Sequence, residues 1–355
     1  MPRRLFSAAV LLLLVLLICC CGCGAVHAEG EKPNQVKLPQ SVELFAPKKT
    51  QVQKGNGKRS MDSFASPSLA SAGGVLVALA EGHINYTGPN SQLLGYTYSD
   101  IVAGYINAAA GWASLVAEIN AGRWEAHTVF SRERQANRVG RAFYPTAVAK
   151  DNKVFLLVGS YDMIDDGSDS HLKEGNWSLE LLVGEATQDK QIQWGQPQQL
   201  LPQIAQSAQA IGVDGFFSAG GSGVVMANGA LVFPVVANKG GETSSLVSTI
   251  IYSTDGGQHW ALAQGMLPTD CTSSLLAEWE AGQLLMIADC TFGHKVFESR
   301  DMGATWAETV RTLSRVRGDS ESDPLQEARL VTSLTTATIA GKAAHALHPD
   351  RVPTR

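Results

Sequence analysis

The chain has 355 residues, of which 45% are hydrophobic, 17% charged and 7% aromatic, and its formal charge at pH 7 is −5. This length is enough for one large domain or two ordinary ones, each with a sizeable core. The mildly acidic balance and the lack of a basic run exclude a dedicated nucleic-acid binder. The 35 glycines, set against few charged residues, favour a turn-rich β protein over a coiled coil or a disordered chain.

Residues 1–28 have the pattern of a secretory signal peptide. Arg3 and Arg4 precede an apolar run from Ala8 to Ile18, and small residues follow up to Ala28. A membrane anchor is the weaker alternative, because a bilayer needs about 20 apolar residues and this run is shorter. The chain also ends without a hydrophobic tail. We therefore expect a secreted or cell-surface protein whose mature chain has neither a transmembrane segment nor a GPI-anchor signal.

Removal of that peptide leaves Cys271 and Cys290 as the remaining cysteines. The secretory route is oxidising, so we expect a Cys271–Cys290 disulfide, and two cysteines do not supply the ligands of a metal site. Asn85 and Asn176 each begin an N-glycosylation sequon, which suits an extracellular surface. The histidines show no metal-ligand spacing, so the sequence predicts neither a metal nor a cofactor.

Residues 29–63 form a polar leader, rich in Lys, Gln and Pro, for which we expect little order. After it, pairs of short apolar strands joined by a tight turn recur along the chain. The turns lie at Ala72-Gly73, Asp151-Asn152, Asn228-Gly229, Ala281-Gly282 and Ala340-Gly341. Irregularly spaced hairpins of this kind are typical of the blades of an all-β propeller. Helical periodicity is brief, at Trp112, Leu115, Val116 and Ile119.

One eight-residue motif, Ser-x-Asp-x-Gly-x-x-Trp, occurs twice, each time after an apolar strand. The first copy contains Ser253, Asp255, Gly257 and Trp260, and the second contains Ser299, Asp301, Gly303 and Trp306. The polar oxygens satisfy nearby backbone N–H groups, Gly takes the positive φ, and Trp buries its ring. The motif resembles the Asp-box (BNR) repeat of sialidases. We interpret both aspartates as structural residues of the turn and not as a catalytic pair.

The resemblance extends beyond this repeat to the trypanosome trans-sialidase superfamily. The blocks that carry it run in family order: Phe64–Leu69, Tyr144-Pro145-Thr146, Val154–Tyr161, Val183-Gly184-Glu185, Glu278-Trp279-Glu280, Glu298–Gly303 and Thr312–Val316. The resemblance implies a six-bladed sialidase-type β-propeller over residues 64–318. Residues 319–355 then hold a partial blade and a divergent tail, so we expect the propeller to be incomplete at its C-terminus.

Active members of that superfamily transfer or hydrolyse terminal sialic acid. An arginine cluster binds the sugar carboxylate, a tyrosine activated by a glutamate attacks the anomeric carbon, and an aspartate is the acid/base. The matching positions here carry other residues: Ala65 and Asp289 for arginines, Tyr144 for the acid/base, Lys173 for a substrate-contacting aspartate and Ser273 for the glutamate. The third arginine and the tyrosine are expected beyond the end of the chain. We therefore predict no catalytic residues.

Three hypotheses remain. The first is an enzymatically silent adhesin or immune decoy that binds host cell-surface glycans or matrix proteins. The second is residual sialidase or trans-sialidase activity, supported by the retained Glu278-Trp279-Glu280 and by His171. The third is a gene fragment that does not fold, because an open ring would leave an exposed sheet edge.

Overall fold

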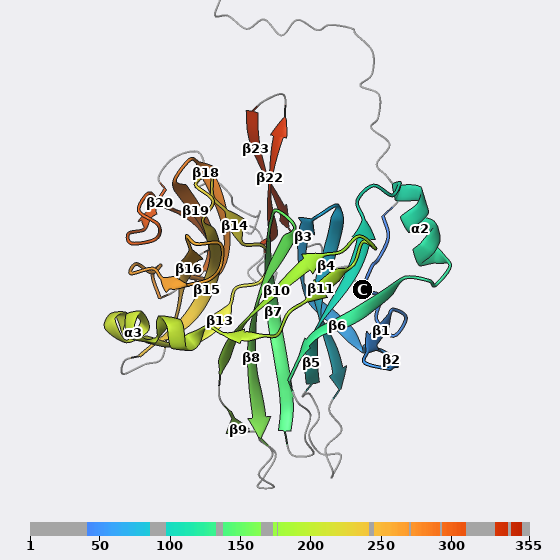
Figure 1. Cartoon of the computed structure of the whole chain (residues 1–355). Coiled ribbons are helices and arrows are strands. Elements are labelled where there is room, and N and C mark those ends of the chain that lie inside the picture. Colours follow the sequence, from blue (N-terminus) through green and yellow to red (C-terminus); the bar gives the residue numbers. More distant parts are fainter. Residues whose placement is uncertain are drawn as a thin grey trace, which may run out of the picture. The chain divides into compact units, whose positions relative to one another are not determined.

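The computed structural model describes residues 41–85, 97–132, 138–164, 173–175, 177–240, 245–269, 271–291, 293–309, 331–339 and 342–349. Strands dominate this part of the chain, which also contains the helices α2 (Trp112–Asn120) and α3 (Leu201–Ile211). Figure 1 shows these elements in chain order. The predicted signal peptide and Asn176 lie outside the described residues, whereas Asn85 is an exposed residue at the end of a strand.

The first sheet consists of two antiparallel meanders and some short strands. One meander is β3-β4-β5-β6 and the other is β7-β8-β10-β11, and a parallel bridge between Ser99 and Arg141 joins them. The bounds are β1 Gln51–Lys54, β2 Gly57–Ser60, β3 Ser63–Ala72, β4 Val75–Asn85, β5 Thr97–Asn107, β6 Glu125–Ser131, β7 Arg138–Lys150, β8 Lys153–Ile164, β9 Lys173–Glu174, β10 Ser178–Ala186, β11 Ile192–Trp194 and β12 Gln198–Gln199.

Three further sheets follow along the chain. The second contains β13 (Val213–Ser218), β14 (Val224–Val225), β15 (Leu231–Lys239), β16 (Ser245–Ser253) and β17 (Ala261–Leu262). The third is the meander β18 (Cys271–Glu280), β19 (Gln283–Cys290), β20 (Gly293–Ser299) and β21 (Ala307–Glu308), and the fourth pairs β22 (Val331–Ile339) with β23 (Lys342–Pro349). The strands that flank each of the five predicted turns pair antiparallel.

Three elements, in two segments of the chain, differ from the expectation drawn from the sequence. β1 and β2 lie within the predicted polar leader, and β1 pairs with β6 through Val52 and Ala126. Val52 and Met61 are fully buried in one small cluster, so these few apolar side chains hold the segment on the first sheet. Helix α3 was not expected, because only Ile204 and Ala208 are buried along it.

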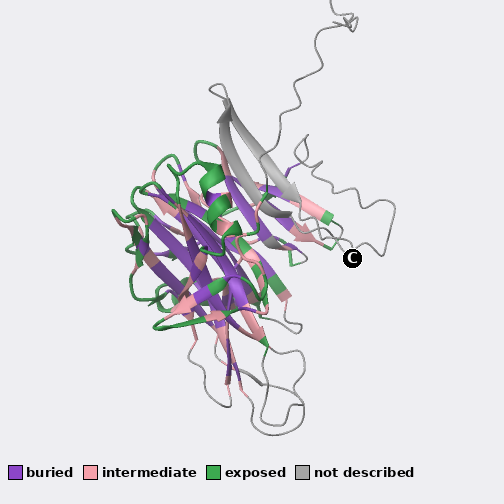
Figure 2. Cartoon of the chain, turned by 90° about the vertical axis from the view of Figure 1, so that its right-hand side faces the viewer, coloured by how far each residue is buried: buried purple, intermediate pink, exposed green. Residues whose placement is uncertain are grey.

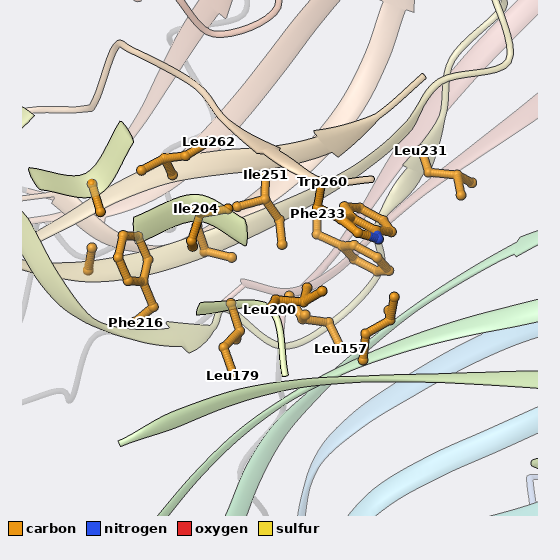
Figure 3. Packing of buried hydrophobic residues seen from close by; sticks show 14 of the residues in the cluster. Leu157, Leu179, Leu200, Ile204, Phe216, Leu231, Phe233, Ile251, Trp260 and Leu262 are labelled. Carbon is orange, nitrogen blue, oxygen red and sulfur yellow. The ribbon is translucent and has the colours of Figure 1, made fainter. Parts of the chain in front are cut away.

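The largest core cluster joins the first sheet to the second sheet and to α3. It contains Leu157 and Leu179 from the first sheet, Phe233 from β15 and Ile204 from α3. Each of these side chains is at most 1% exposed. Figure 3 shows the rings of Phe233 and Trp260 lying against each other within this cluster. Figure 2 shows where residues are buried along the chain: buried residues follow the strands, and exposed residues lie mainly in the loops and on the helix. Apolar burial on this scale is the main stabilising term of such a fold.

Both Asp-box motifs form the same hydrogen-bonded turn. In the first, Ser253 Oγ donates to Asp255 Oδ1 at 2.8 Å and accepts from the Gly257 N–H at 2.8 Å. In the second, Ser299 Oγ donates to Asp301 Oδ1 and accepts from the Gly303 N–H, again at 2.8 Å each. Hydrogen bonds from the residue four positions on lower the pKa of each aspartate below its ordinary value. The aspartates therefore serve the turn, as charged acceptors of backbone N–H groups.

A disulfide joins Cys271 of β18 to Cys290 of β19. The two residues are direct partners in the antiparallel register, and their Cα atoms are 4.0 Å apart. Cys271 is fully buried in the core cluster under the third sheet. The disulfide fixes the end of the hairpin whose next residue pair, Thr272 and Asp289, borders the site described below.

Candidate functional site

The first strand of each of the four meanders carries an irregularity at a corresponding place. The register shifts between Ala65 and Ser68 in β3, between Phe143 and Thr146 in β7, between Asp214 and Phe217 in β13, and between Thr272 and Leu275 in β18. β-bulges of this kind re-aim side chains and are common beside functional sites. Of the positions picked out from the sequence, Ala65 borders the first of these bulges, and Tyr144 and Ser273 lie within the bulges of β7 and β18.

The bulges in β3 and β7 share a backbone conformation. Ser66 and Tyr144 have φ values of 49° and 50°, and each precedes a proline. Positive φ is uncommon outside glycine and costs a non-glycine residue of the order of 1–2 kcal/mol. The following hydroxyls fix both bulges to one loop of the second sheet: Ser68 Oγ donates to the Gly221 carbonyl at 2.5 Å, and Thr146 Oγ1 accepts from the Gly220 N–H at 2.9 Å.

A pocket of about 330 Å³ opens between these bulges, and we call it the central pocket. Five aromatic side chains from three strands and one loop line it: Phe143, Tyr144, Tyr161, Trp177 and Phe217. Glu81, Arg141 and Thr272 are among the polar residues of its wall, and Leu246 is one of its apolar residues. Its lining thus comes from the first three sheets, and its mixture of ring faces with a few polar groups is typical of small-molecule sites.

The aromatic rings form one contiguous wall. Phe143 meets Tyr144, Tyr161 and Trp177 edge-on, with centroids 5.3, 5.4 and 5.9 Å away. Tyr161 and Trp177 lie more nearly face to face, with centroids 4.6 Å apart. Phe143 is buried, whereas Tyr144 is 43% exposed. The outer rings therefore offer apolar surface to a ligand while the inner ring holds them in place.

Glu81 is a buried carboxylate in the pocket wall. Its Oε1 accepts the Tyr144 N–H at 2.6 Å, and its Oε2 lies 3.0 Å from His83 Nε2. Burial raises the pKa of the Tyr144 phenol, and the negative charge of Glu81 raises it further. The phenol thus keeps its proton at neutral pH, which disfavours a role as a nucleophile.

Arg141 of β7 lies directly across from Tyr161 of β8 in the antiparallel register. Its Nη1 donates to the Tyr161 hydroxyl at 3.2 Å, and its guanidinium carbon lies 5.8 Å from the centroid of that ring. The half-buried guanidinium is thereby held against an aromatic face.

Of the five positions picked out from the sequence, one lines this pocket and three are neighbours of a lining residue. Tyr144 lines it, Ala65 is the register partner of Glu81, and Ser273 follows the lining residue Thr272. Asp289 is the register partner of Thr272, and its carboxylate contacts Nδ1 of His294 in β20. Lys173 lies in β9, opposite Ile164 of β8.

Glu278, proposed as support for residual activity, has a turn-stabilising role. Its two carboxylate oxygens accept the N–H groups of Ala227 at 2.7 Å and Gly282 at 2.9 Å. His171 lies outside the described residues.

Sequence reasoning missed Glu81, Arg141 and Trp177. Arg141 and Phe143 precede Tyr144-Pro145-Thr146 at alternate positions of one strand, which was the available signal for a shared face. Glu81 and Trp177 gave no local signal, because β4 and the residue before β10 bring them to the pocket from distant parts of the sequence.

Within the described part of the chain, no group of three or more His, Cys, Asp or Glu side chains is arranged to hold a metal ion. Among the same residues, no helix is long and apolar enough to cross a membrane.

Repeated antiparallel meanders, Asp-box turns and a pocket framed by bulges of the innermost strands define a sialidase-type β-propeller. Comparison with known proteins confirms this class. Residues 66–344 match the BNR repeat-like domain family, and the chain belongs to this family and to the trans-sialidase superfamily.

The similar proteins include sialidases of trypanosomes. The chain is 40% identical to "Sialidase 85-1.1" of Trypanosoma cruzi over 327 residues, which are 90% of this chain and 43% of that protein. The structure of Trypanosoma rangeli sialidase matches with a TM-score of 0.67 at 28% identity, covering 86% of this chain and 47% of that one. The same sialidase in complex with the inhibitor DANA matches with a TM-score of 0.65 at 27% identity. The chain therefore spans less than half the length of these relatives.

Proposed function

We propose that this protein is a secreted or surface-displayed glycoprotein that binds host glycans in the central pocket without hydrolysing them. Such binding would serve host-cell adhesion or immune evasion. The observation that carries the proposal is the pocket itself: five aromatic side chains line it, whereas Ala65, Tyr144 and Asp289 occupy the positions where the family resemblance implies charged or acid/base residues.

Support for sugar binding comes from the pocket wall. The ring faces of Tyr161 and Trp177 suit the C–H face of a sugar, and Arg141 and Thr272 supply polar contacts beside them. A Trypanosoma rangeli sialidase of the same fold has been observed with bound sialic acid.

Support for catalytic silence comes from the substituted positions. Ala65 offers no charge to a carboxylate, and Asp289 would repel one. The loss of one charged hydrogen bond costs about 1.5–3 kcal/mol, and the loss of an acid/base group slows a reaction about 100–10,000-fold. These losses together leave no useful rate of hydrolysis.

Residual sialidase activity is the second candidate, and Glu81 is the observation that favours it. A buried carboxylate in the pocket wall is the type of group that serves as an acid/base in glycosidases. Both of its oxygens are already hydrogen-bonded to protein groups, which weakens this candidate.

Turnover of a fluorogenic sialoside by the purified secreted protein separates the two candidates. We expect no release above buffer, for the natural chain and for Glu81→Gln alike, from samples whose circular dichroism shows folded β structure. Turnover by the natural chain that disappears in Glu81→Gln would establish the enzyme and contradict the proposal.

A further inference from the structure

We infer that Ser63, His83 and Glu81 form a nucleophilic relay that hydrolyses acyl esters. Ser63 is the catalytic nucleophile, His83 is its general base, and Glu81 is a positioning residue that orients the imidazole. Glu81 also lines the central pocket, so the relay lies beside it. The inference goes beyond the proposed function, because it concerns the carbonyl carbon of an ester and not the anomeric carbon of a glycoside.

The antiparallel pairing of β3 and β4 brings the three side chains to one face of the first sheet. Ser63 and His83 are direct register partners, and Glu81 lies two residues before His83 on β4. Directly paired residues, and residues two apart on one strand, point to the same side of a sheet. The relay is therefore built on two regular strands, which position side chains more precisely than loops do.

Two hydrogen bonds connect the three side chains in series. Ser63 Oγ lies 3.2 Å from His83 Nδ1, and His83 Nε2 lies 3.0 Å from Glu81 Oε2. A carboxylate can only accept hydrogen bonds, so the proton of the neutral imidazole belongs on Nε2, which donates to Glu81. Nδ1 is then the unprotonated nitrogen, and it accepts the hydrogen bond of the Ser63 hydroxyl. This is the arrangement of a nucleophile, its base and the group that orients the base.

The exposure of the three residues increases from the carboxylate to the hydroxyl. The side chain of Glu81 is 5% exposed and that of His83 is 15% exposed, whereas Ser63 is an exposed residue. Glu81 is also held from its other side, because its Oε1 accepts the Tyr144 N–H. A buried and fixed carboxylate thus orients the imidazole, while the serine hydroxyl is accessible to an ester from solvent.

A second set of serine, histidine and carboxylate, in the first Asp-box, has a different order. Ser253 donates its hydroxyl hydrogen bond to Asp255, and Nδ1 of His259 lies 2.6 Å from the same carboxylate. The serine proton there points at the carboxylate and serves the turn. The proton of Ser63 points instead at the nitrogen of a base, which is what activation of a nucleophile requires.

The reaction that this order supports is a two-step ester hydrolysis. Ser63 Oγ attacks the carbonyl carbon while its proton passes to His83 Nδ1, and the alcohol leaves with that proton as its C–O bond breaks. His83 then takes a proton from water, whose oxygen attacks the acyl-serine. Ser63 recovers its hydrogen from His83 as the carboxylic acid leaves. Water is the co-reactant, and the relay returns to its starting state.

The test is hydrolysis of 4-nitrophenyl acetate by the secreted protein, measured as release of 4-nitrophenolate. We expect Ser63→Ala and His83→Gln each to lower kcat/KM about 100-fold or more, because a nucleophile or its base is lost. Ser71→Ala is the matched control. Ser71 is an exposed serine of the same strand, opposite Leu76, and its replacement should leave the rate unchanged.

Two further readouts separate the roles. A fluorophosphonate probe bonds its phosphorus to an activated serine oxygen and releases fluoride, so mass spectrometry should find the adduct on Ser63 of the natural chain and not on Ser71; this readout requires no variant to fold. The ¹⁵N chemical shifts of the His83 ring report which nitrogen carries the proton. Glu81→Gln should lose the preference for Nε2 and lower the hydrolysis rate, which a merely structural role of Glu81 would not do.

Hydrolysis that survives Ser63→Ala, or labelling of exposed serines without preference for Ser63, would overturn the inference. The absence of both hydrolysis and labelling in the folded natural chain would overturn it as well. None of these outcomes bears on glycan binding, which is tested with probes that carry no ester.

Discussion

Replacement of Trp260 by alanine is the most informative test of the core beneath the first Asp-box. Trp260 is 4% exposed, and its ring lies 5.4 Å from Phe233, centroid to centroid. Its indole N–H donates to the Gly257 carbonyl at 3.2 Å, and its backbone N–H donates to Gln203 of α3 at 3.0 Å. The side chain thus joins the turn to the cluster that links two sheets.

Truncation of a buried tryptophan costs about 3–5 kcal/mol, because apolar burial is lost and a cavity remains. The free energy of unfolding of an ordinary domain is about 5–15 kcal/mol. Trp260→Ala should therefore remove a large share of the stability of this domain. Trp306 is the matched control, since it occupies the same place in the second Asp-box but is only partly buried. Trp306→Ala should cost roughly half as much.

The free energies of unfolding would be measured by guanidinium denaturation, followed by far-ultraviolet circular dichroism because tryptophan fluorescence changes with the substitution. The test is which of the two variants loses more free energy of unfolding. A loss from Trp306→Ala that equals or exceeds the loss from Trp260→Ala would refute the assignment of the larger core role to Trp260.

Two further predictions concern stability. Replacement of both Cys271 and Cys290 by serine should cost on the order of 3 kcal/mol in the same denaturation assay, because the disulfide closes a loop of sequence separation 19; an unchanged value would contradict this. Burial raises the pKa of Glu180, so its protonated form favours folding and that contribution is lost as pH rises through the folded-state pKa. Glu180→Gln should therefore be more stable than the natural chain at about pH 7.5 and nearly equal to it at about pH 4, and a constant difference would contradict this sign.

Local sequence signals sufficed for the repeated parts of the fold. The turns at Asp151 and Gly229 and the two Asp-boxes depend on contacts within a few residues, so residue type and spacing predict them. The periodicity at Trp112–Ile119 predicts α2 for the same reason.

The missed elements depend on contacts between distant segments. β1 is held by the burial of Val52 against the first sheet, and α3 by the packing of Ile204 in a cluster that spans two sheets. Neither segment has a strong pattern of its own, so tertiary packing decides its conformation.

The pocket was predictable only in part. The family resemblance drew attention to Ala65, Tyr144 and Ser273, and the structure places them in the bulges that frame the pocket. Register shifts and the positive φ of Tyr144 have no clear sequence signature outside glycine. Because these features cannot be predicted from the sequence, neither can the placement of Glu81 and Arg141 in one pocket.

The central claim is that the central pocket binds a host glycan and leaves it intact. Saturation-transfer NMR of 3′-sialyllactose with the secreted protein tests both halves in one sample, because bound sugar and released sialic acid give separate signals. We predict saturation of the sugar protons and no free sialic acid after prolonged incubation. Accumulation of free sialic acid, or the absence of any saturation transfer, would contradict the account.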